Sequence, residues 1–320
     1  MKSSVNLSDY YYRELYPTVM AVENERLEII SRLKHNILLL ILASIGIIPL
    51  IIKFFGSNGA IFYIALAGFA YMAFRLYIKS YSTFCNHYKD NIIVPLLHHL
   101  NKSILFYPDM VINKSLFLES QIFKKYPEKY SGSNYISGTI SDVKIELSDV
   151  NASYVYTNAK GERRESTLFN GILIVAEFHK NFNTKTIILP DFAEKTLGKV
   201  VGNFLQSYNG TFGELIKLDN IEFEKEFVVY GEDQIESRYI LSHSLMKRLV
   251  QYKKRLNKDI SISFVNNHIF IAINSPTAMF KPDIFTSLES FDSASKSIST
   301  IQNTLGIIRE LKLNEKIWSK

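Results

Sequence analysis

The stretch from Ile260 to Ile273 reads ISISFVNNHIFIAI and holds two short apolar runs on either side of a polar pair. β-Branched and aromatic residues dominate both runs, which is typical of strands. Asn266 and Asn267 separate the runs, and paired asparagines favour a turn. We therefore predict strands over Ile260–Phe264 and His268–Ile273, joined at the two asparagines.

The same kind of pattern recurs on the N-terminal side of this hairpin. Strand patterns are present at 134–147, 152–157, 171–178, 184–189 and 221–230. Helical spacing of apolar residues is present at 191–207, 243–257 and 292–313. Clustered strands, with helices between and after them, predict an α+β domain with antiparallel strands rather than a parallel α/β fold.

Two apolar runs lie nearer the N-terminus. Ile37–Ile52 reads ILLLILASIGIIPLII, and Ala60–Phe74 reads AIFYIALAGFAYMAF. Extended past Lys53 and Arg75, each covers about 19 residues, or roughly 28 Å of helix, close to the thickness of a hydrocarbon core. We predict a transmembrane helical hairpin over 37–78, with spans of about 37–55 and 60–78. The alternative is a helical hairpin buried in a soluble core.

The charges around these runs predict an orientation. Basic residues precede the first run and follow the second, whereas Lys53 is the one basic residue in the connection. By the positive-inside bias, both termini are expected in the cytoplasm, and the protein is expected in the inner (plasma) membrane as a multi-pass protein. The expected organisation is an N-terminal cytoplasmic helix over 1–36, the hairpin, a juxtamembrane helix over 79–102, and a cytoplasmic α+β domain over 103–320.

Composition excludes several classes of protein. The chain has 320 residues, 47% of them hydrophobic, so it has enough apolar material for a core and is not a disordered chain. Its one cysteine, Cys85, excludes a disulfide scaffold and a cysteine-rich metal site. The formal net charge of +6 is modest, so no nucleic-acid partner is expected.

Motifs of common enzymes are missing from the sequence. The seven histidines include no His-Glu-x-x-His pair, and no Walker loop, dinucleotide fingerprint or Gly-x-Ser-x-Gly elbow is present. No cofactor and no metal is therefore expected, and no catalytic residue can be named. Whether the protein is an enzyme stays open, although a non-enzymatic role is favoured.

A basic helix is the candidate contact surface. Opposite its apolar stripe, the helix at 243–257 with the residue after it presents Lys247, Lys254 and Lys258, flanked by Arg248 and Arg255, and a loop adds Arg163 and Arg164. Basic residues beside anionic lipid attract the head groups. We expect these residues to contact anionic lipid head groups or a protein partner. The alternative is an ordinary solvated helix face.

A carboxylate-rich segment supports a rival hypothesis. Between Glu222 and Arg238 the chain carries six acidic residues, three of them at alternate positions of an expected strand. An unrecognised membrane-associated enzyme could use them to hold a cation or a substrate amine. The commoner explanation for such a pattern is a solvated strand face with Lys or Arg partners.

Six short segments together carry a resemblance to known proteins: Ser120–Phe123, Tyr135–Gly138, Phe169–Gly171, Phe223–Gln234, Glu236–Ser242 and Leu313–Trp318. They resemble a bacterial family catalogued as domain of unknown function 3137. The resemblance covers roughly residues 85–320, and 223–242 is its most specific part. It implies a bacterial, membrane-anchored protein and brings no activity, substrate or catalytic residue. The sequence thus predicts an uncharacterised integral membrane protein that serves as a membrane-tethered interaction or sensing module.

Overall fold

The computed structural model describes residues 7–55, 60–140, 143–177, 181–191 and 212–310. The chain divides into two compact units, and each is considered by itself. The first unit comprises residues 1–100 with 280–298, and the second comprises 101–279 with 299–320. Most of the expected helix over 191–207 lies outside the described residues.

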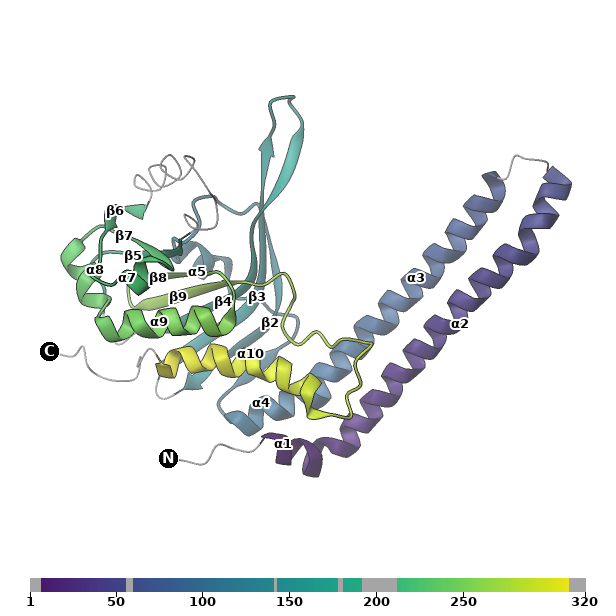
Figure 1. Ribbon diagram of the computed structural model, residues 1–320, viewed down its shortest axis with the longest axis horizontal. Coiled ribbons are helices and arrows are strands. Elements are labelled where there is room, and N and C mark those ends of the chain that lie inside the picture. The colour runs from purple at the N-terminus through teal and green to yellow at the C-terminus, as the bar shows by residue number, and fades with distance from the viewer. Residues whose placement is uncertain (1–6, 56–59, 141–142, 178–180, 192–211, 311–320) are drawn as a thin grey trace. The chain divides into compact units, whose positions relative to one another are not determined.

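The first unit is helical (Figure 1). Its elements are α1 (Leu7–Tyr10), the π-helical turn η1 (Tyr11–Leu15), α2 (Tyr16–Phe55), α3 (Ala60–Tyr88), a second π-helical turn η2 (Lys89–Ile93), α4 (Val94–Leu100) and the beginning of α10 (Phe291–Glu310). The buried residues of this unit recur at intervals of four, because residues four apart lie on one face of a helix. The fully buried residues Tyr88, Ile92 and Leu96 show this spacing on one chain segment.

Each π-helical turn ends two residues before a proline. The turn η1 ends at Leu15 before Pro17, and η2 ends at Ile93 before Pro95. Proline has no N–H, and its ring clashes with the carbonyl four residues earlier, so the regular hydrogen-bond ladder cannot continue there. The wider π-helical turn accommodates the missing hydrogen bond, and α-helix continues before and after it.

The expected transmembrane hairpin is not found. In the parts of the chain that the structure describes, none of the helices combines the length and the apolar character that crossing a membrane requires. The predicted spans at 37–55 and 60–78 are portions of the longer helices α2 and α3. Charged residues at 53 and 75 confine the uncharged runs to 37–52 and 60–74, shorter than the about 20 residues that a span needs. The prediction of a two-span hairpin is therefore wrong.

The second unit contains an antiparallel sheet of nine described strands. They are β1 (Leu105–Tyr107), β2 (Lys129–Ile140), β3 (Val143–Thr157), β4 (Arg163–Glu177), β5 (Thr186–Pro190), β6 (Glu214–Ile216), β7 (Phe227–Gly231), β8 (Ile260–Val265) and β9 (His268–Asn274). Their order across the sheet is β1-β2-β3-β4-β9-β8-β5-β7-β6. The α+β fold with clustered antiparallel strands is confirmed.

The predicted hairpin at 260–273 lies near the middle of this sheet. The strands β8 and β9 pair in antiparallel register from Ile260 opposite Ile273 to Val265 opposite His268. Asn266, in the turn, has a φ of 54°, a left-handed conformation that asparagine adopts more readily than most residues. The two strands are almost continuously buried, because both faces of the sheet are covered at this point.

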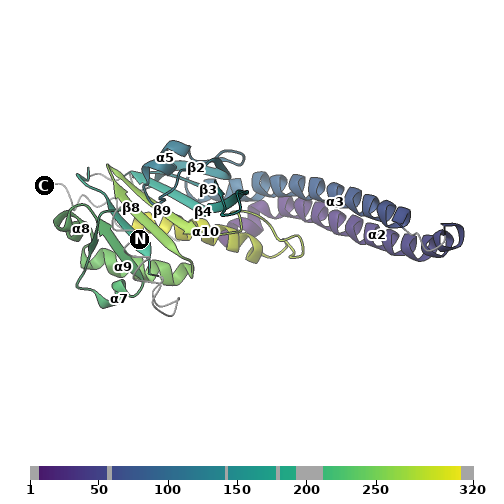
Figure 2. The same cartoon turned by 90° about the horizontal axis from the view of Figure 1, so that it is seen from above.

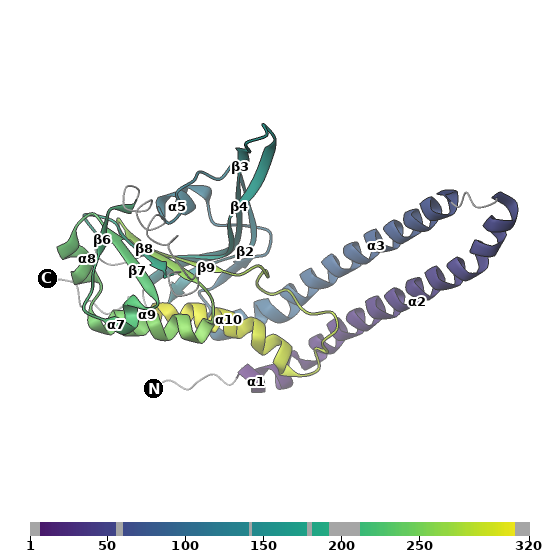
Figure 3. The same cartoon turned by 45° about the horizontal axis from the view of Figure 1, so that its top comes forward.

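Short helices cover the two faces of the sheet. Figures 2 and 3 show α5 (Lys114–Glu119) on one side and α9 (His243–Leu256) on the other. Phe117 of α5 packs in a buried cluster with side chains of β3, β4, β8 and β9, among them Val150, Phe169 and Phe270. The remaining helices, α7 (Ile221–Glu224) and α8 (Gln234–Ile240), lie before and after β7.

Candidate functional site

The basic helix predicted at 243–257 is α9, and its boundaries follow from its capping residues. The Ser242 hydroxyl accepts a hydrogen bond from the Leu245 backbone N–H, which is typical of an N-cap. At the other end Asn257 adopts a left-handed conformation with a φ of 50°. Leu249 and Tyr252 are buried, so the predicted apolar stripe faces the interior of the unit.

The predicted basic residues of this helix differ in their surroundings. Lys247, Lys254 and Arg255 are exposed, and Arg248 is half-buried. Lys258, just past the helix end, is also half-buried, and its Nζ donates a 2.8 Å hydrogen bond to the Ser275 hydroxyl. Burial lowers the pKa of the Lys258 amine. Lys258 therefore points toward the β9 end and is less suited to contact a lipid surface than Lys247 and Lys254.

The helix α7 lies beside α9 and replaces the first part of the expected strand over 221–230. The Asn220 side chain accepts a hydrogen bond from the Phe223 backbone N–H at 3.0 Å and so begins the helix. Phe223 is fully buried, whereas Ile221 on the same short helix is 75% exposed. The strand β7 begins only at Phe227. The alternation of acidic and apolar residues that favoured a strand here was misleading.

Glu222 on α7 lies among three lysines. Lys254 Nζ is 2.7 Å from Glu222 Oε1 and donates a hydrogen bond to it. This bond, together with the positive charges of Lys254, Lys247 and Lys225, lowers the pKa of the Glu222 carboxyl. The same pair raises the pKa of the Lys254 amine. Three lysines thus act on the Glu222 carboxylate, and the Glu226 carboxylate, which is paired with Lys253, also acts on Lys254. Lys225, Lys247 and Lys254, with Glu222 and Ile221, are hereafter the α7–α9 surface.

Lys225 was missed by the sequence analysis. It follows α7 directly and is exposed, and in an extended strand it would have pointed away from its neighbours Glu224 and Glu226. The signal that could have found it is Asn220 followed by two acidic residues within the next four positions, a pattern of helix N-termini. A helical turn at 221–224 places residue 225 at the C-terminal end, beside α9.

A buried lysine holds α9 against β7. Lys253 is 7% exposed, and its Nζ donates a 2.6 Å hydrogen bond to the Glu226 carbonyl and forms a 2.9 Å ion pair with the Glu226 carboxylate. The same Nζ lies 4.9 Å from the centre of the Phe227 ring, a cation–π distance. Lys253 is thus bonded within the unit, and its neighbour Lys254 faces outward.

The two arginines of the predicted basic loop are not near the basic helix. Arg163 and Arg164 begin β4, at the tip of the long β3–β4 hairpin, and Arg164 forms a 2.7 Å ion pair with Glu162. Figure 1 shows this hairpin extending from the sheet on the side away from α9. The predicted set of seven basic residues is therefore divided between two places in the second unit.

The carboxylates between Glu222 and Arg238 do not converge. Glu224 accepts a hydrogen bond from the Leu218 backbone N–H, and Glu232 pairs with Lys185. Asp233 is the N-cap of α8, where its side chain accepts hydrogen bonds from two backbone N–H groups. Within the described ranges, no three His, Cys, Asp or Glu residues are grouped so that they could hold a metal ion.

Glu236 is the most buried of these carboxylates, at 8% exposed. It accepts hydrogen bonds from the Asn183 N–H at 3.0 Å, the Thr184 N–H at 2.8 Å and the Thr184 hydroxyl at 2.6 Å. These bonds connect α8 to the chain just before β5. Because Glu236 and Arg238 are two residues apart on α8, they do not share a face of the helix.

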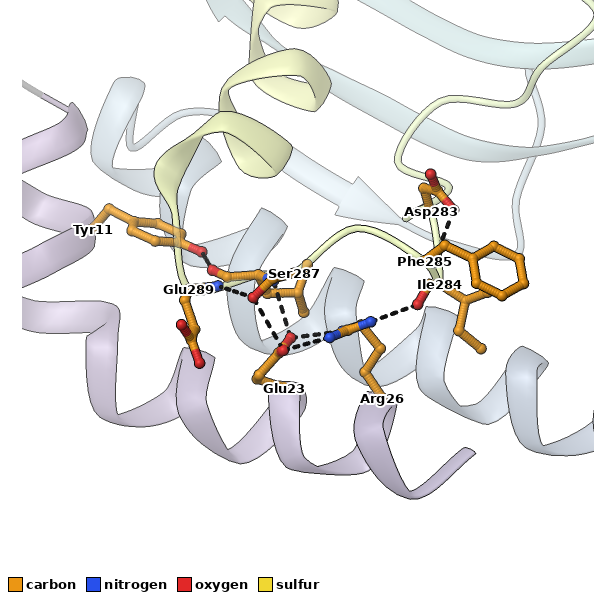
Figure 4. Close-up of polar contacts among 9 residues, drawn as sticks. Tyr11, Glu23, Arg26, Asp283, Ile284, Phe285, Ser287 and Glu289 are labelled. Atoms are coloured by element: carbon orange, nitrogen blue, oxygen red, sulfur yellow. Dashed lines mark hydrogen bonds and ion pairs between the residues drawn. The ribbon is translucent and has the colours of Figure 1, made fainter. Parts of the chain in front are cut away.

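The first unit contains a buried ion pair that sequence patterns did not reveal (Figure 4). Glu23 and Arg26, one turn apart on α2, are 2% and 5% exposed, and Arg26 donates two hydrogen bonds to the Glu23 carboxylate, at 2.6 and 2.8 Å. Arg26 also donates to the Ile284 carbonyl, and Glu23 accepts from the Leu288 N–H. The pair thereby satisfies backbone groups in the segment before α10.

Neighbouring contacts hold the same segment in place. The Tyr11 hydroxyl donates to the Leu288 carbonyl, and the Ser287 hydroxyl donates to Glu23. The Asp283 carboxylate accepts from the Phe285 N–H, and the Phe285 side chain is 72% exposed (Figure 4). The charged groups of Glu23, Arg26 and Asp283 each have a protein partner, so we interpret the cluster as structural.

Comparison with known proteins gives a match to one family model over part of the chain. Residues 167–313, which include α7, α8 and α9, match the model of a family described as "Protein of unknown function (DUF3137)". No curated protein matches the chain. A solved structure, the crystal structure of the mycobacterial trehalose monomycolate transport factor A, TtfA, is similar at 9% identity over 57% of this chain and 75% of that chain. Its TM-score of 0.28 is too low to support a conclusion about fold or function.

Proposed function

We propose that this chain, whose residues 167–313 match the DUF3137 family model, is a non-enzymatic interaction module whose α7–α9 surface binds anionic lipid head groups. The observation that carries the proposal is the arrangement of Lys225, Lys247 and Lys254 around the carboxylate of Glu222. Clustered basic residues are attracted to the negative potential of anionic lipid, and the attraction falls off within a Debye length. Three lysines from two adjoining helices concentrate that attraction in one place.

Ile221 supports a lipid surface as the partner. Its side chain is 75% exposed, and Ile221 lies one helical turn before Lys225, whose backbone N–H donates to the Ile221 carbonyl, so an apolar group lies on the same side of α7 as one of the basic groups. Peripheral binding combines electrostatic attraction to head groups with burial of apolar side chains at the acyl boundary. A soluble polyanion would make use of the lysines but would leave the isoleucine in water.

The enzymatic alternative finds less support in the geometry of the carboxylates. A site that held a cation or a substrate amine would bring several of the carboxylates between 222 and 238 to one point. Instead, Glu224, Asp233 and Glu236 each accept hydrogen bonds from a different part of the backbone. Those bonds fasten α7, α8 and the start of β5, and the proposal assigns these carboxylates to the stability of the unit.

Sedimentation of the full chain with vesicles tests the proposal. Phosphatidylcholine vesicles containing about 30% phosphatidylglycerol are compared with phosphatidylcholine alone at fixed ionic strength. The wild type is expected to sediment with the anionic vesicles. Reversal of the three lysines (K225E, K247E and K254E together) should lower the apparent affinity by about tenfold or more, because it replaces attraction by repulsion.

The matched control reverses three exposed lysines elsewhere in the same unit. Lys102, Lys144 and Lys160 are exposed and lie outside α7 and α9, so K102E/K144E/K160E makes the same change in net charge. If both triple variants lose binding equally, the attraction follows net charge, and the assignment to the α7–α9 surface is wrong. Loss in the first variant alone supports the assignment.

A further inference from the structure

The Glu222 carboxylate occupies the position among the lysines where an external anion would bind. Lys254 Nζ donates to Glu222 Oε1 at 2.7 Å, and Lys247 and Lys225 lie close enough for their charges to act on the same carboxylate. A carboxylate and the non-bridging oxygens of a phosphodiester are both anionic hydrogen-bond acceptors, and ammonium groups bind both. The side chain of Glu222 therefore resembles the acceptor of a head group.

We propose that Glu222 is an internal counter-ion that competes with the head-group phosphate of an anionic lipid for Lys254, and so limits binding to membranes of high negative charge density. This inference rests on the proposed function of the α7–α9 surface. On binding, Lys254 Nζ exchanges its hydrogen bond with Glu222 Oε1 for one with a phosphate oxygen, and no covalent bond changes. Glu222 then lies beside an anionic surface, where its charge is repelled.

The exposure of the pair makes this exchange easy. The side chains of Lys254 and Glu222 are 54% and 63% exposed, and exposed ion pairs are held weakly because water solvates both charges. The helix α7 does not depend on the Glu222 side chain. It is begun by Asn220 and anchored by the fully buried Phe223. Replacing the carboxylate should therefore remove a competitor without unfolding the helix.

The test is the neutral, nearly isosteric variant E222Q in the full chain. We expect E222Q to bind vesicles of phosphatidylcholine and phosphatidylglycerol about threefold to tenfold more tightly than the wild type, with the largest gain at low phosphatidylglycerol content. The gain should shrink as salt is added, because salt screens exposed charges. Equal or weaker binding by E222Q overturns the inference.

The matched control is E162Q. Glu162 is another exposed carboxylate of the second unit that pairs with a cation, Arg164, at 2.7 Å, so its replacement makes the same change in net charge. We expect E162Q to bind as the wild type does. If E162Q gains as much as E222Q, the effect comes from net charge alone and Glu222 has no special role.

Two further comparisons distinguish failure of the Glu222 competition from failure of lipid binding by the α7–α9 surface. If K225E/K247E/K254E loses binding but E222Q is unchanged, the lipid surface stands and the competition by Glu222 is wrong. If the triple variant binds as the wild type does, the proposed function itself is wrong. Displacement from vesicles by inorganic phosphate, and not by chloride at equal ionic strength, would identify free phosphate as the ligand and overturn the assignment to lipid.

Discussion

Lys254 on α9 donates a 2.7 Å hydrogen bond to Glu222 on α7, 32 positions earlier in the sequence, and so connects the two helices. Its sequence neighbour Lys253 points the other way, to Glu226 and the Phe227 ring. Consecutive lysines thus serve different purposes. Lys253 stabilises the unit from within, and Lys254 belongs to the exposed surface that we propose binds lipid.

We predict that K253M destabilises the second unit by about 2 kcal/mol, because the Glu226 carbonyl and the half-buried Glu226 carboxylate lose the buried ammonium group of Lys253 as their donor. Thermal or urea unfolding of the full chain, followed by a probe in the second unit, measures the change. The adjacent variant K254M is the control and should unfold like the wild type. Equal destabilisation by the two variants would contradict the separate roles of the two lysines.

We predict that E236Q destabilises the second unit by about 2 kcal/mol. The carboxylate accepts three hydrogen bonds from Asn183 and Thr184, and an amide can accept with only one of its two polar atoms. The expected pattern is lower stability and unchanged vesicle binding at temperatures where the variant is folded. A stable E236Q protein would mean that these bonds contribute little, and the structural explanation of the buried carboxylate would be lost.

We predict that the buried ion pair of the first unit makes stability depend on acid pH. Burial alone raises the pKa of Glu23, but hydrogen bonds from Arg26 and the Leu288 N–H outweigh it and hold the pKa below its ordinary value of 4.5. A lowered folded-state pKa contributes stability that is fully present above the ordinary value and is lost as pH falls through the folded-state value.

The variant E23Q isolates this contribution. It should unfold about 2 to 4 kcal/mol more easily near neutral pH, because it leaves Arg26 buried without its charged partner. Its difference from the wild type should shrink as the pH is lowered below 4.5. Unfolding measured across that range checks the prediction, and a difference that is constant with pH would contradict the lowered pKa.

We predict that I221S weakens binding to anionic vesicles about threefold to tenfold while leaving stability unchanged. The side chain is 75% exposed, so its loss removes little packing, but it removes the apolar group that would be buried at a lipid surface. I235S is a matched control, because Ile235 on α8 is 81% exposed. Weakening by both variants to the same extent would show that the apolar contact is not confined to the α7–α9 surface.

The sequence predicted the elements whose local signals and packing agree. The hairpin at 260–273 and the helix at 243–257 were predicted because their apolar patterns match the faces that they bury. The nine-strand order could not be predicted, because β4 pairs with β9 and β5 with β8 across long stretches of chain. Such pairings depend on tertiary packing rather than on local pattern.

The failures have identifiable causes. Between 221 and 230 the alternating acidic residues resembled a strand, but the Asn220 cap and the buried Phe223 favour a helical turn. The two apolar runs at 37–55 and 60–78 reached membrane length only because they were extended past Lys53 and Arg75, which limit the uncharged runs to 37–52 and 60–74 of longer helices. The roles of Lys225 and Lys253 depend on how α7 lies beside α9, which single-sequence patterns do not reveal.

The most direct test of the central claim is the fraction of wild-type protein bound to vesicles as their phosphatidylglycerol content is raised at constant ionic strength. We predict weak binding to phosphatidylcholine alone and a steep rise with the anionic fraction, reversed by added salt, because the α7–α9 surface presents three lysines around one carboxylate. Binding that stays flat across the series would contradict the claim that this surface recognises anionic lipid.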